Sequence, residues 1–224
     1  MTDPRAASLN DARLKIQWAE KRLQELRREV VEFTNAEMEK ADIKLNPSPG
    51  VPFYFGRPDS PIPPSIPLLC GEIVQHLRST LDYLVYELAL LDSAEIQTGT
   101  QFPIEDSEDT FWKRRRRTWL EHVSDDHVSG IEQVQPYRGV VWSRVLRDLS
   151  NEDKHKTIVV FTHNTGLEAT IEKAVDEGGR MEGLKIKAQF QTYVCFPDGE
   201  DVVATLATLK NGVGDLIDAF DAEF

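Results

Sequence analysis

Two short stretches of the sequence carry side chains that could do chemistry, and the first lies within an apolar helix. The stretch GEIVQHLRSTLDYLVYELALL, residues 71–91, has apolar side chains at helical spacing, yet it also carries His76, Arg78, Asp82 and Tyr83. Arg78 and Asp82 are four residues apart, so they lie together on one flank of the apolar stripe. They form either a half-exposed ion pair or part of a cleft that holds further polar groups.

The second stretch is SNEDKHK, residues 150–156. Asp153, Lys154 and His155 put an acid, a base and an imidazole that titrates near neutral pH in consecutive positions. Consecutive side chains point in different directions, so at most two of the three can share one site. Asn151 either joins this polar cluster or caps a helix in an ordinary turn. We expect Arg78 and Asp82 to face this stretch across a helix–helix contact.

One basic run stands out in an acidic chain. FWKRRRRTW, residues 111–119, places two tryptophans beside four consecutive arginines: Arg114, Arg115, Arg116 and Arg117. These side chains could contact phosphates and stack on bases, with Lys154 as a further cation for nucleic acid. Alternatively, the run is a solvated helix face that pairs with the acidic residues just upstream.

No pattern in the sequence is typical of a metal or cofactor site. His122 and His127 flank two aspartates, but this spacing does not align both imidazoles on one helix face. There is no glycine-rich phosphate loop, no nucleophile elbow and no dinucleotide fingerprint. Cys70 and Cys195 lack C-x-x-C spacing, and we expect buried free thiols in a reducing compartment. We predict neither a metal nor a cofactor.

Length and composition are typical of a single globular domain with a sizeable core. The 224 residues include 38 acidic and 26 basic side chains, for a formal net charge of −12. That charge argues against a broad nucleic-acid footprint but leaves room for a local basic groove. The N-terminus MTDPRAASLNDARLK has no apolar segment, and the longest apolar segment, around 81–91, is too short to span a bilayer. We expect a cytoplasmic protein that makes no membrane contact.

The first half of the chain predicts long helices. Apolar residues from Leu9 to Phe33 recur in alternating steps of three and four, which predicts one helix over residues 9–42. Its seam packs either inside the chain, which we favour, or against a second copy. Residues 46–67 contain eight prolines and predict an extended connector, in which PFYF can form a short strand. A helix over 68–92 follows, with Pro67 in its first turn.

In the second half we expect three shorter helices, one after Ser107, one before Pro136 and one over 140–149. Strands are predicted after them. TIVVFTH, LEATIEKAV and LKIKAQFQTYVCF are rich in β-branched and aromatic residues and predict strands, and the last segment of the chain is helical again. We therefore predict an α+β fold, mainly a helical bundle with a long N-terminal helix and a small antiparallel sheet in the C-terminal third. The single domain, 1–224, divides into that helix (1–45), the connector (46–67), a helical core (68–156) and the sheet with a C-terminal helix (157–224).

Four blocks of the sequence resemble the signature blocks of a group of uncharacterised bacterial proteins. The blocks are LRSTLDYL, QFPI, QPY and NEDKHK, in that order. Those proteins typically carry an L-R-S-A-L-D-H-type helix, an F-P-I segment, an L-Q-P-Y turn and an N-x-D-K-H-R block. The likeness covers roughly residues 66–160 and implies no particular activity.

A weaker similarity extends to HEPN domains, helical bundles that often dimerise and cleave RNA without a metal. Their motif is R-N-x-x-x-H. Arg78 matches its first half, but Tyr83 stands at the histidine position. Asn151 and His155 match its second half, but Ser150 stands at the arginine position.

The HEPN resemblance implies a composite site for cleavage of RNA by transesterification. In that site Arg78 would hold phosphate and His155 would exchange protons, while Asp82 or Asp153 would orient either one.

Three classes of function are open. We expect first a non-catalytic interaction or scaffold protein that self-associates through its helices as a homodimer. The second is a HEPN-like, metal-independent ribonuclease or RNA-binding protein that uses Arg78 and His155. The third is a small-ligand-binding protein, in which a closed pocket lined by Tyr83, Tyr86 or Trp142 would adjoin the polar cluster.

Overall fold

The structure is a computed structural model that describes residues 6–40, 42–45, 53–56, 60–114, 119–175 and 181–224. The chain folds into two compact units. The first, the helical unit, comprises Met1–Arg27, Pro64–Ile158 and Val203–Phe224; the second, the hairpin unit, comprises Arg28–Pro63 and Val159–Val202. A single domain over 1–224 stays a prediction.

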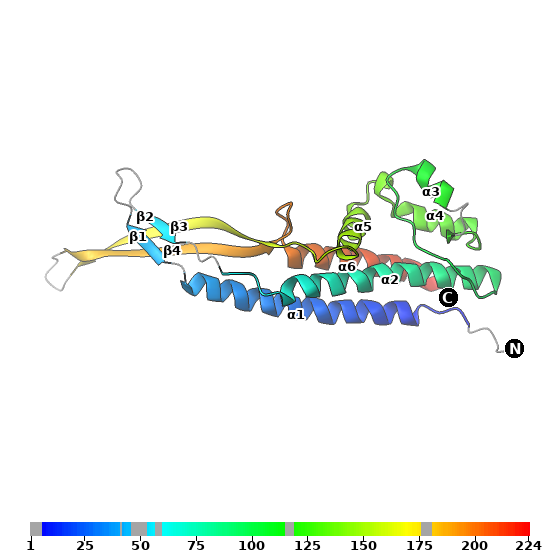
Figure 1. The fold of residues 1–224 in the computed structure, drawn as a ribbon, viewed down its shortest axis with the longest axis horizontal. Coiled ribbons are helices and arrows are strands. Elements are labelled where there is room, and N and C mark those ends of the chain that lie inside the picture. The colour runs from blue at the N-terminus through cyan, green and yellow to red at the C-terminus, as the bar shows by residue number, and fades with distance from the viewer. Residues whose placement is uncertain (1–5, 41, 46–52, 57–59, 115–118, 176–180) are drawn as a thin grey trace. The chain divides into compact units, whose positions relative to one another are not determined.

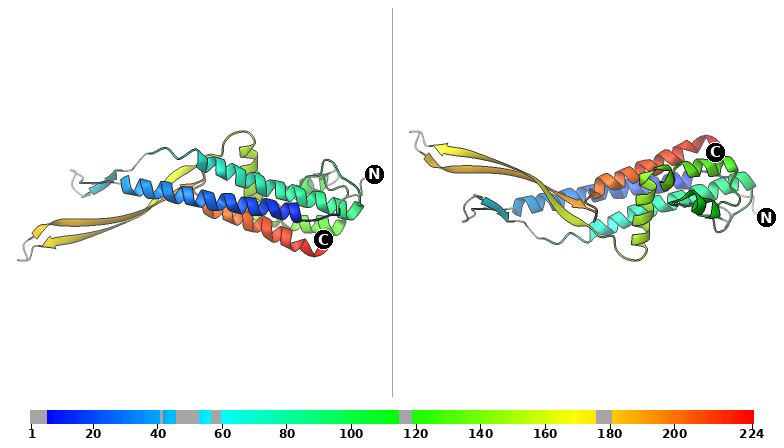
Figure 2. Two further views of the ribbon diagram at one scale, coloured as in Figure 1. Left: turned by 90° about the horizontal axis from the view of Figure 1, so that it is seen from below. Right: turned by 90° about the horizontal axis from the view of Figure 1, so that it is seen from above.

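Three long helices form the frame of the helical unit: α1 (Asn10–Lys40, up to Arg27), α2 (Ser65–Ser93) and α6 (Val202–Ala219). They run side by side in all the ribbon views (Figures 1 and 2). Lys210 Nζ lies 2.9 Å from Glu20 Oε2, and Arg22 Nε lies 2.7 Å from Glu72 Oε2, so α1 is tied to both of its neighbours.

The apolar seam of α1 packs inside the chain. In the part of α1 that belongs to the helical unit, the buried seam residues are Leu9, which just precedes the helix, and Ala12, Ala19, Leu23 and Leu26. Intramolecular packing is the alternative that we favoured for these positions. Burying such side chains stabilises the fold by on the order of 1.5–3 kcal/mol for each large one.

The predicted apolar stripe of α2 forms the centre of the core. Its fully buried members are Ile73, Leu77, Leu81, Leu84 and Leu88. For two residues, the observed burial differs from that predicted by the helical periodicity. Leu91 is exposed near the end of the helix, whereas Glu87, expected on the solvated side, is buried and accepts the backbone N–H of Ser8 at 2.9 Å. The segment before α1 covers this side of α2, which the sequence of α2 alone cannot show.

Shorter helices complete the helical unit: α3 (Glu108–Arg114), α4 (Asp125–Gln133), the 3₁₀ helix η2 (Pro136–Arg138), α5 (Val141–Asp153) and the 3₁₀ helix η3 (Asp221–Glu223). Helix α5 packs on α2 at Gly71, where a Cβ would collide with the Asp153 carboxylate. The absence of a side chain at Gly71 therefore allows the two helices to approach closely.

The hairpin unit contains two separate antiparallel pairs of strands among the described residues. β3 (Phe161–Val175) pairs with β4 (Met181–Cys195), in register from Phe161↔Cys195 to Val175↔Met181 with two irregularities. β1 (Asp42–Leu45) pairs with β2 (Phe53–Gly56). The α+β fold, with its long N-terminal helix and antiparallel sheet in the C-terminal third, is confirmed.

Several boundaries differ from the sequence prediction. The long helix ends at Lys40, because Asp42–Leu45 instead pairs with the strand that PFYF contributes. The end of TIVVFTH, from Phe161 on, and all of LEATIEKAV belong to one strand, β3, which pairs with β4 along its length with two irregularities. Strand pairing supplies backbone partners from distant residues, so it overrides the local signals that mark boundaries.

Candidate functional site

Arg78 and Asp82 lie in the middle of α2 and bind one residue of the segment that follows the helix. Arg78 is 9% exposed, and its Nη2 donates to the carbonyl oxygen of Phe102 at 2.7 Å. Asp82 Oδ1 accepts the N–H of Phe102 at 2.9 Å and lies 3.2 Å from Arg78 Nη2. Burial raises the pKa of Asp82 and lowers the pKa of Arg78, since each charge is removed from water, and the attraction between the two opposes both shifts.

Gln135 holds the same segment from the other side. Its side chain is fully buried; Nε2 donates to the carbonyl oxygen of Pro103 at 2.9 Å, and Oε1 accepts the N–H of Glu105 at 2.9 Å. The backbone of residues 102–105 is therefore fixed by polar side chains of α2 and of the turn after α4.

These contacts bring three of the four resembling blocks together: LRSTLDYL through Arg78 and Asp82, QFPI through its backbone, and QPY through Gln135. The fourth block, NEDKHK, contributes Asn151 and Lys154 to the lining of a cavity of about 250 Å³, which Arg78 and Phe102 also line. We call it the Arg78 cavity, and the residues that line it are Arg78, Gln101, Phe102, Ile104, Glu105, Trp119, Arg147, Ser150, Asn151 and Lys154.

Two buried polar atoms of residues that line the Arg78 cavity have no hydrogen-bond partner within the described part of the chain. They are Nη1 of Arg78 and Oγ of Ser150, whose residue is 1% exposed. A buried donor without a partner costs on the order of 1–3 kcal/mol, so such atoms are rare in native proteins. Nη1 of Arg78 and the Ser150 hydroxyl are thus hydrogen-bond donors that the described contacts leave unsatisfied.

The charges around the cavity are unequally neutralised. Arg147 Nη1 lies 2.8 Å from Asp106 Oδ2, and its Nη2 lies 2.9 Å from Asp148 Oδ1. Lys154, by contrast, forms no ion pair within the described part of the chain. Glu105 is the single carboxylate among the described residues that line the cavity. The site can therefore hold an anion between Arg78 and Lys154.

The remaining catalytic candidates lie elsewhere. Asp153 accepts a hydrogen bond from Gln75 Nε2 at 3.0 Å and packs over Gly71, so its described contacts join α5 to α2. His155 follows the end of α5, is exposed and does not line the Arg78 cavity. Of the four candidates, the structure brings Arg78 and Asp82 into contact with each other and joins neither Asp153 nor His155 to them.

The polar cluster expected around these residues is split as well. Asn151 lines the Arg78 cavity, but His76 and Tyr83 do not. Burial lowers the pKa of the half-buried His76, with the charge of Lys15 as a second cause. Tyr83 is partly exposed, with Lys15 Nζ 5.0 Å from its ring centroid, and it lines a separate cavity of about 380 Å³ together with Tyr86 and Asp82.

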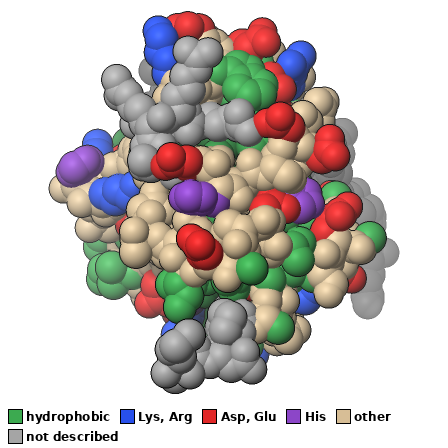
Figure 3. Space-filling model, turned by 90° about the vertical axis from the view of Figure 1, so that its right-hand side faces the viewer, with side chains coloured by type: hydrophobic (Ala, Val, Ile, Leu, Met, Phe, Trp, Pro, Cys, Tyr) green, Lys and Arg blue, Asp and Glu red, His purple; other side chains and the backbone are tan. Residues whose placement is uncertain are grey.

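The basic run cannot be compared with its predicted role. Arg115, Arg116 and Arg117 lie outside the described residues, as does the side chain of Arg114 at the end of α3. Upstream, Lys113 pairs with Asp109 within α3, as expected for a solvated helix face. On the molecular face in Figure 3, the visible Lys and Arg side chains are scattered among acidic ones.

Sequence reasoning missed Arg147 and Ser150. With Asn151 and Lys154 they occupy positions i, i+3, i+4 and i+7 along α5 and its C-cap, which places all four on one face. This spacing could have identified Arg147 and Ser150 from the sequence, because it predicts a polar helix face on which a neutral hydroxyl lies between cations.

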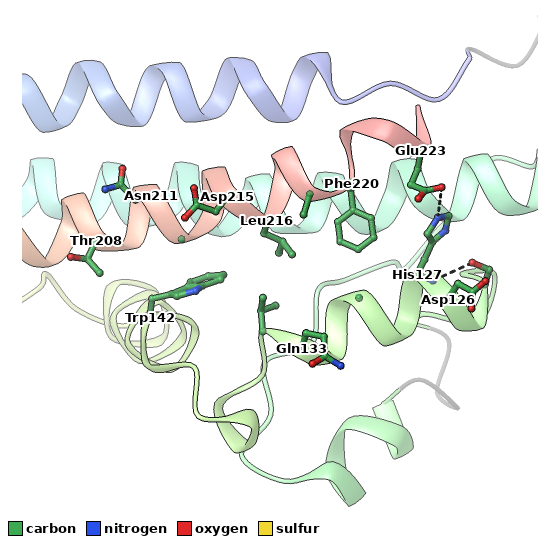
Figure 4. Close-up of a pocket in the computed structure, with 15 residues that line it drawn as sticks. Asp126, His127, Gln133, Trp142, Thr208, Asn211, Asp215, Leu216, Phe220 and Glu223 are labelled. Atoms are coloured by element: carbon green, nitrogen blue, oxygen red, sulfur yellow. Dashed lines mark hydrogen bonds and ion pairs between the residues drawn. The ribbon is translucent and has the colours of Figure 1, made fainter.

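A larger groove lies between α4 and α6 (Figure 4). It has a volume of about 940 Å³. Its lining includes Trp142, Phe220 and the carboxylates of Asp126, Asp215 and Glu223, and no Lys or Arg is among the described residues that line it. Trp142, expected beside the polar cluster, lines this groove instead.

Comparisons with models of protein families, with curated proteins and with solved structures find no match to this chain. Among the described helices, none combines the length and the apolar character needed to cross a membrane. The described residues also contain no group of three or more His, Cys, Asp or Glu side chains placed to hold a metal ion. The functional argument therefore rests on the geometry of the Arg78 cavity.

Proposed function

We propose that this chain is a ligand-binding protein that holds a small anion in the Arg78 cavity. The observation that carries the proposal is the buried guanidinium of Arg78, a residue that lines the cavity and whose Nη1 has no hydrogen-bond partner among the described residues. An anion bound there would accept a charge-assisted hydrogen bond, which is stronger than one between neutral groups.

The other donors around the cavity support an anion. Ser150 offers a hydroxyl without a hydrogen-bond partner among the described residues, Asn151 an amide, and Lys154 a cation outside any described ion pair. The volume of about 250 Å³ lies just below the range of roughly 300–1,000 Å³ that holds drug-sized ligands. The ligand is therefore a small molecule.

Thermal unfolding in the presence of small anions tests the proposal. Phosphate, sulfate and acetate are added in turn to wild type, Lys154→Ala and Lys156→Ala. Lys156 has the same charge two residues away, but it pairs with Glu152 at 3.3 Å and does not line the cavity. A ligand that binds only the native state raises Tm. At a ligand concentration of 100 times Kd, it adds about 2.7 kcal/mol to the free energy of unfolding.

The expected result is that at least one of the anions raises the Tm of wild type and of Lys156→Ala, while Lys154→Ala responds much less. Equal responses of all three proteins would show that the stabilisation comes from general salt effects. No response in wild type would make the Arg78 cavity a structural feature and contradict the proposal.

The ribonuclease hypothesis stays a separate prediction. Incubation of mixed-sequence RNA in excess EDTA with wild type, Arg78→Ala and His155→Ala tests it. Cleavage that is lost in both variants, each folded by circular dichroism, would support a nuclease. RNA that stays intact with wild type would contradict one, without bearing on anion binding.

Self-association through helices as a homodimer also stays a prediction. Sedimentation of the wild-type protein over a range of concentrations measures it directly. A monomer at all concentrations would contradict the scaffold hypothesis in its dimeric form.

A further inference from the structure

We infer that the groove between α4 and α6 is a docking site for a basic amphipathic helix of a partner protein. The groove has a volume of about 940 Å³, and the described residues that line it all belong to the helical unit. None of them also lines the Arg78 cavity. The inference therefore does not depend on anion binding in that cavity.

Two close contacts between a glycine and an aromatic ring hold the helices around the groove. A Cβ at Gly212 on α6 would lie 2.7 Å from the ring of Trp142 on α5. A Cβ at Gly130 on α4 would lie 2.7 Å from the ring of Phe220, which follows α6. Gly212 and Phe220 are about 12 Å apart along the helix axis, because each helical residue adds about 1.5 Å. This length corresponds to about two turns of a partner helix.

The groove has accessible apolar surface. Trp142 and Val134, which both line it, are half-buried, and Ala219 at the end of α6 is exposed. Val141, which precedes Trp142 in the chain, is 59% exposed. Figure 4 shows the Trp142 ring extending from α5 toward α6. Apolar surface in a groove is typical of an interaction site, because contact with a partner removes it from water.

Carboxylates lie at both ends of the groove. Asp215 lies near Trp142, whereas Asp126 and Glu223 lie near His127 (Figure 4). Glu223 Oε2 is 3.7 Å from His127 Nε2, but Asp126 and Asp215 form no ion pair within the described part of the chain. Since no Lys or Arg is among the described residues that line the groove, its charge is negative. It complements a partner that carries Lys or Arg on both sides of an apolar stripe.

The lining favours a helix over an extended peptide. The described residues that line the groove belong to or adjoin helices, and none of them belongs to a strand. An extended peptide usually binds along a free sheet edge, which supplies backbone hydrogen bonds, whereas a helix satisfies its own backbone. An amphipathic helix can therefore place apolar side chains on Trp142 and Val134 and cations beside Asp126 and Asp215.

Fluorescence anisotropy with three labelled peptides tests the inference. Each peptide has about 14 residues, roughly four turns of helix. The first has leucines on one face and lysines on the other; the second has alanines in place of the leucines, and the third has glutamates in place of the lysines. We expect the Leu/Lys peptide to bind wild type about tenfold or more tightly than either of the others. Its binding should weaken as salt is added, because salt screens exposed charge pairs.

A pair of double variants locates the charged contacts. Asp126→Asn with Asp215→Asn should weaken binding of the Leu/Lys peptide by about fivefold, because two exposed ion pairs are lost. Glu95→Gln with Glu121→Gln is the matched control, since it changes the net charge equally at two exposed positions outside the groove. Urea midpoints of both proteins exclude loss of folding as the cause.

A pair of single variants locates the peptide on α6. Ala219→Gln puts a longer polar side chain at the groove and should weaken the Leu/Lys peptide by about fivefold or more. Ala204→Gln, at an exposed position of the same helix outside the groove, should leave its binding unchanged.

Contrary results would overturn the inference in distinct ways. Equal weakening by the two double variants would mean that the peptide responds to the net charge of −12 and not to the groove. Alanine or glutamate peptides that bind as tightly as the Leu/Lys peptide would remove the case for an apolar stripe or for cations, respectively. Displacement of the peptide by an equal concentration of spermine would make the groove a site for small cations. Self-association of wild type that Ala219→Gln abolishes would assign the groove to a second copy of this chain.

Discussion

Arg78 and Asp82, four residues apart on α2, bind the two polar backbone groups of a single residue: Arg78 donates to the carbonyl oxygen of Phe102, and Asp82 accepts its N–H. The ion pair thus positions a chain segment that begins twenty residues later. Nη2 of Arg78 is used in this contact, whereas its Nη1 has no hydrogen-bond partner among the described residues.

Removal of the Asp82 carboxylate should destabilise the protein. Asp82→Ala leaves the Phe102 N–H without an acceptor and Arg78 without its counter-charge, and we expect a loss of about 2 kcal/mol, because Asp82 is only partly buried. Asp82→Asn keeps an acceptor oxygen and should lose less. Urea unfolding measures both. Glu121→Ala, at an exposed position, is the control, and a loss for Asp82→Ala no larger than this control would contradict the role of the pair.

Ser150→Ala should stabilise the protein without ligand. The hydroxyl is buried and has no hydrogen-bond partner in the described structure, so its removal should raise the free energy of unfolding by about 1 kcal/mol. Ser143 on the same helix is the matched control, because its equally buried hydroxyl donates to the carbonyl oxygen of Val140 at 3.2 Å. Ser143→Ala should therefore be destabilising. Chemical denaturation compares the two, and a destabilised Ser150→Ala would show that its hydroxyl already has a partner.

Two glycines of α6 should respond oppositely to alanine. A Cβ at Gly212 would lie 2.7 Å from atoms of the Trp142 ring, so Gly212→Ala should force the indole to move and cost about 1–3 kcal/mol. At Gly214 a Cβ would meet nothing within 4 Å, so Gly214→Ala should gain up to about 1 kcal/mol from helix propensity. Thermal unfolding of both variants checks the pair. Equal effects would place Trp142 away from α6.

Acidification should weaken the contact between α1 and α6. The hydrogen bond from Lys210 lowers the pKa of Glu20 below its ordinary value of 4.5. The Glu20 carboxylate therefore binds a proton less readily in the folded state than in the unfolded state. The stability that the Glu20–Lys210 pair contributes is present above the pKa of Glu20 in the unfolded state, and it is lost as pH falls through the pKa of Glu20 in the folded state. Lys210→Met should reduce stability at neutral pH and flatten the acid side of the stability curve below about pH 5. Urea midpoints at several pH values measure this, and parallel curves for the two proteins would contradict it.

The two thiols should be inert in the native protein. Burial raises the pKa of Cys70 to about 12 and also raises the pKa of Cys195, so little of either is thiolate. Alkylation with iodoacetamide at mildly alkaline pH, followed by mass spectrometry, should label neither cysteine in native buffer and both in urea. Rapid native labelling of Cys70 would mean that α2 opens locally.

Local periodicity was sufficient for much of the fold. The stripe from Ile73 to Leu88 and the seam from Leu9 to Leu26 could be predicted from spacing, since a helix turns by a constant angle per residue and its buried face follows from that alone. The same reasoning failed for Glu87, because the segment that covers it lies 79 residues away in the chain.

The candidate site was predictable only in part. Spacing identified Arg78 and Asp82 as neighbours, and we expected the stretch 150–156, which includes Asn151 and Lys154, to face them. The HEPN resemblance added Asp153 and His155 to that group, although Asp153 bonds to Gln75 and His155 is exposed. Adjacent residues leave a helix in different directions, and the spacing does not say which of them faces inward.

The sequence by itself determined the helices, their apolar faces and the charge types near α2, because these depend on residues within one or two turns of each other. Only the tertiary structure decided which buried polar atoms have hydrogen-bond partners. Arg78 Nη2 finds its acceptor in Phe102, whereas Ser150 Oγ finds no partner among the residues that the structure describes. Both results depend on the packing of α2, α5 and the segment around Phe102 against one another. A hydrogen bond requires its two atoms to lie about 3 Å apart, and that distance arises only when segments far apart in the chain are brought together.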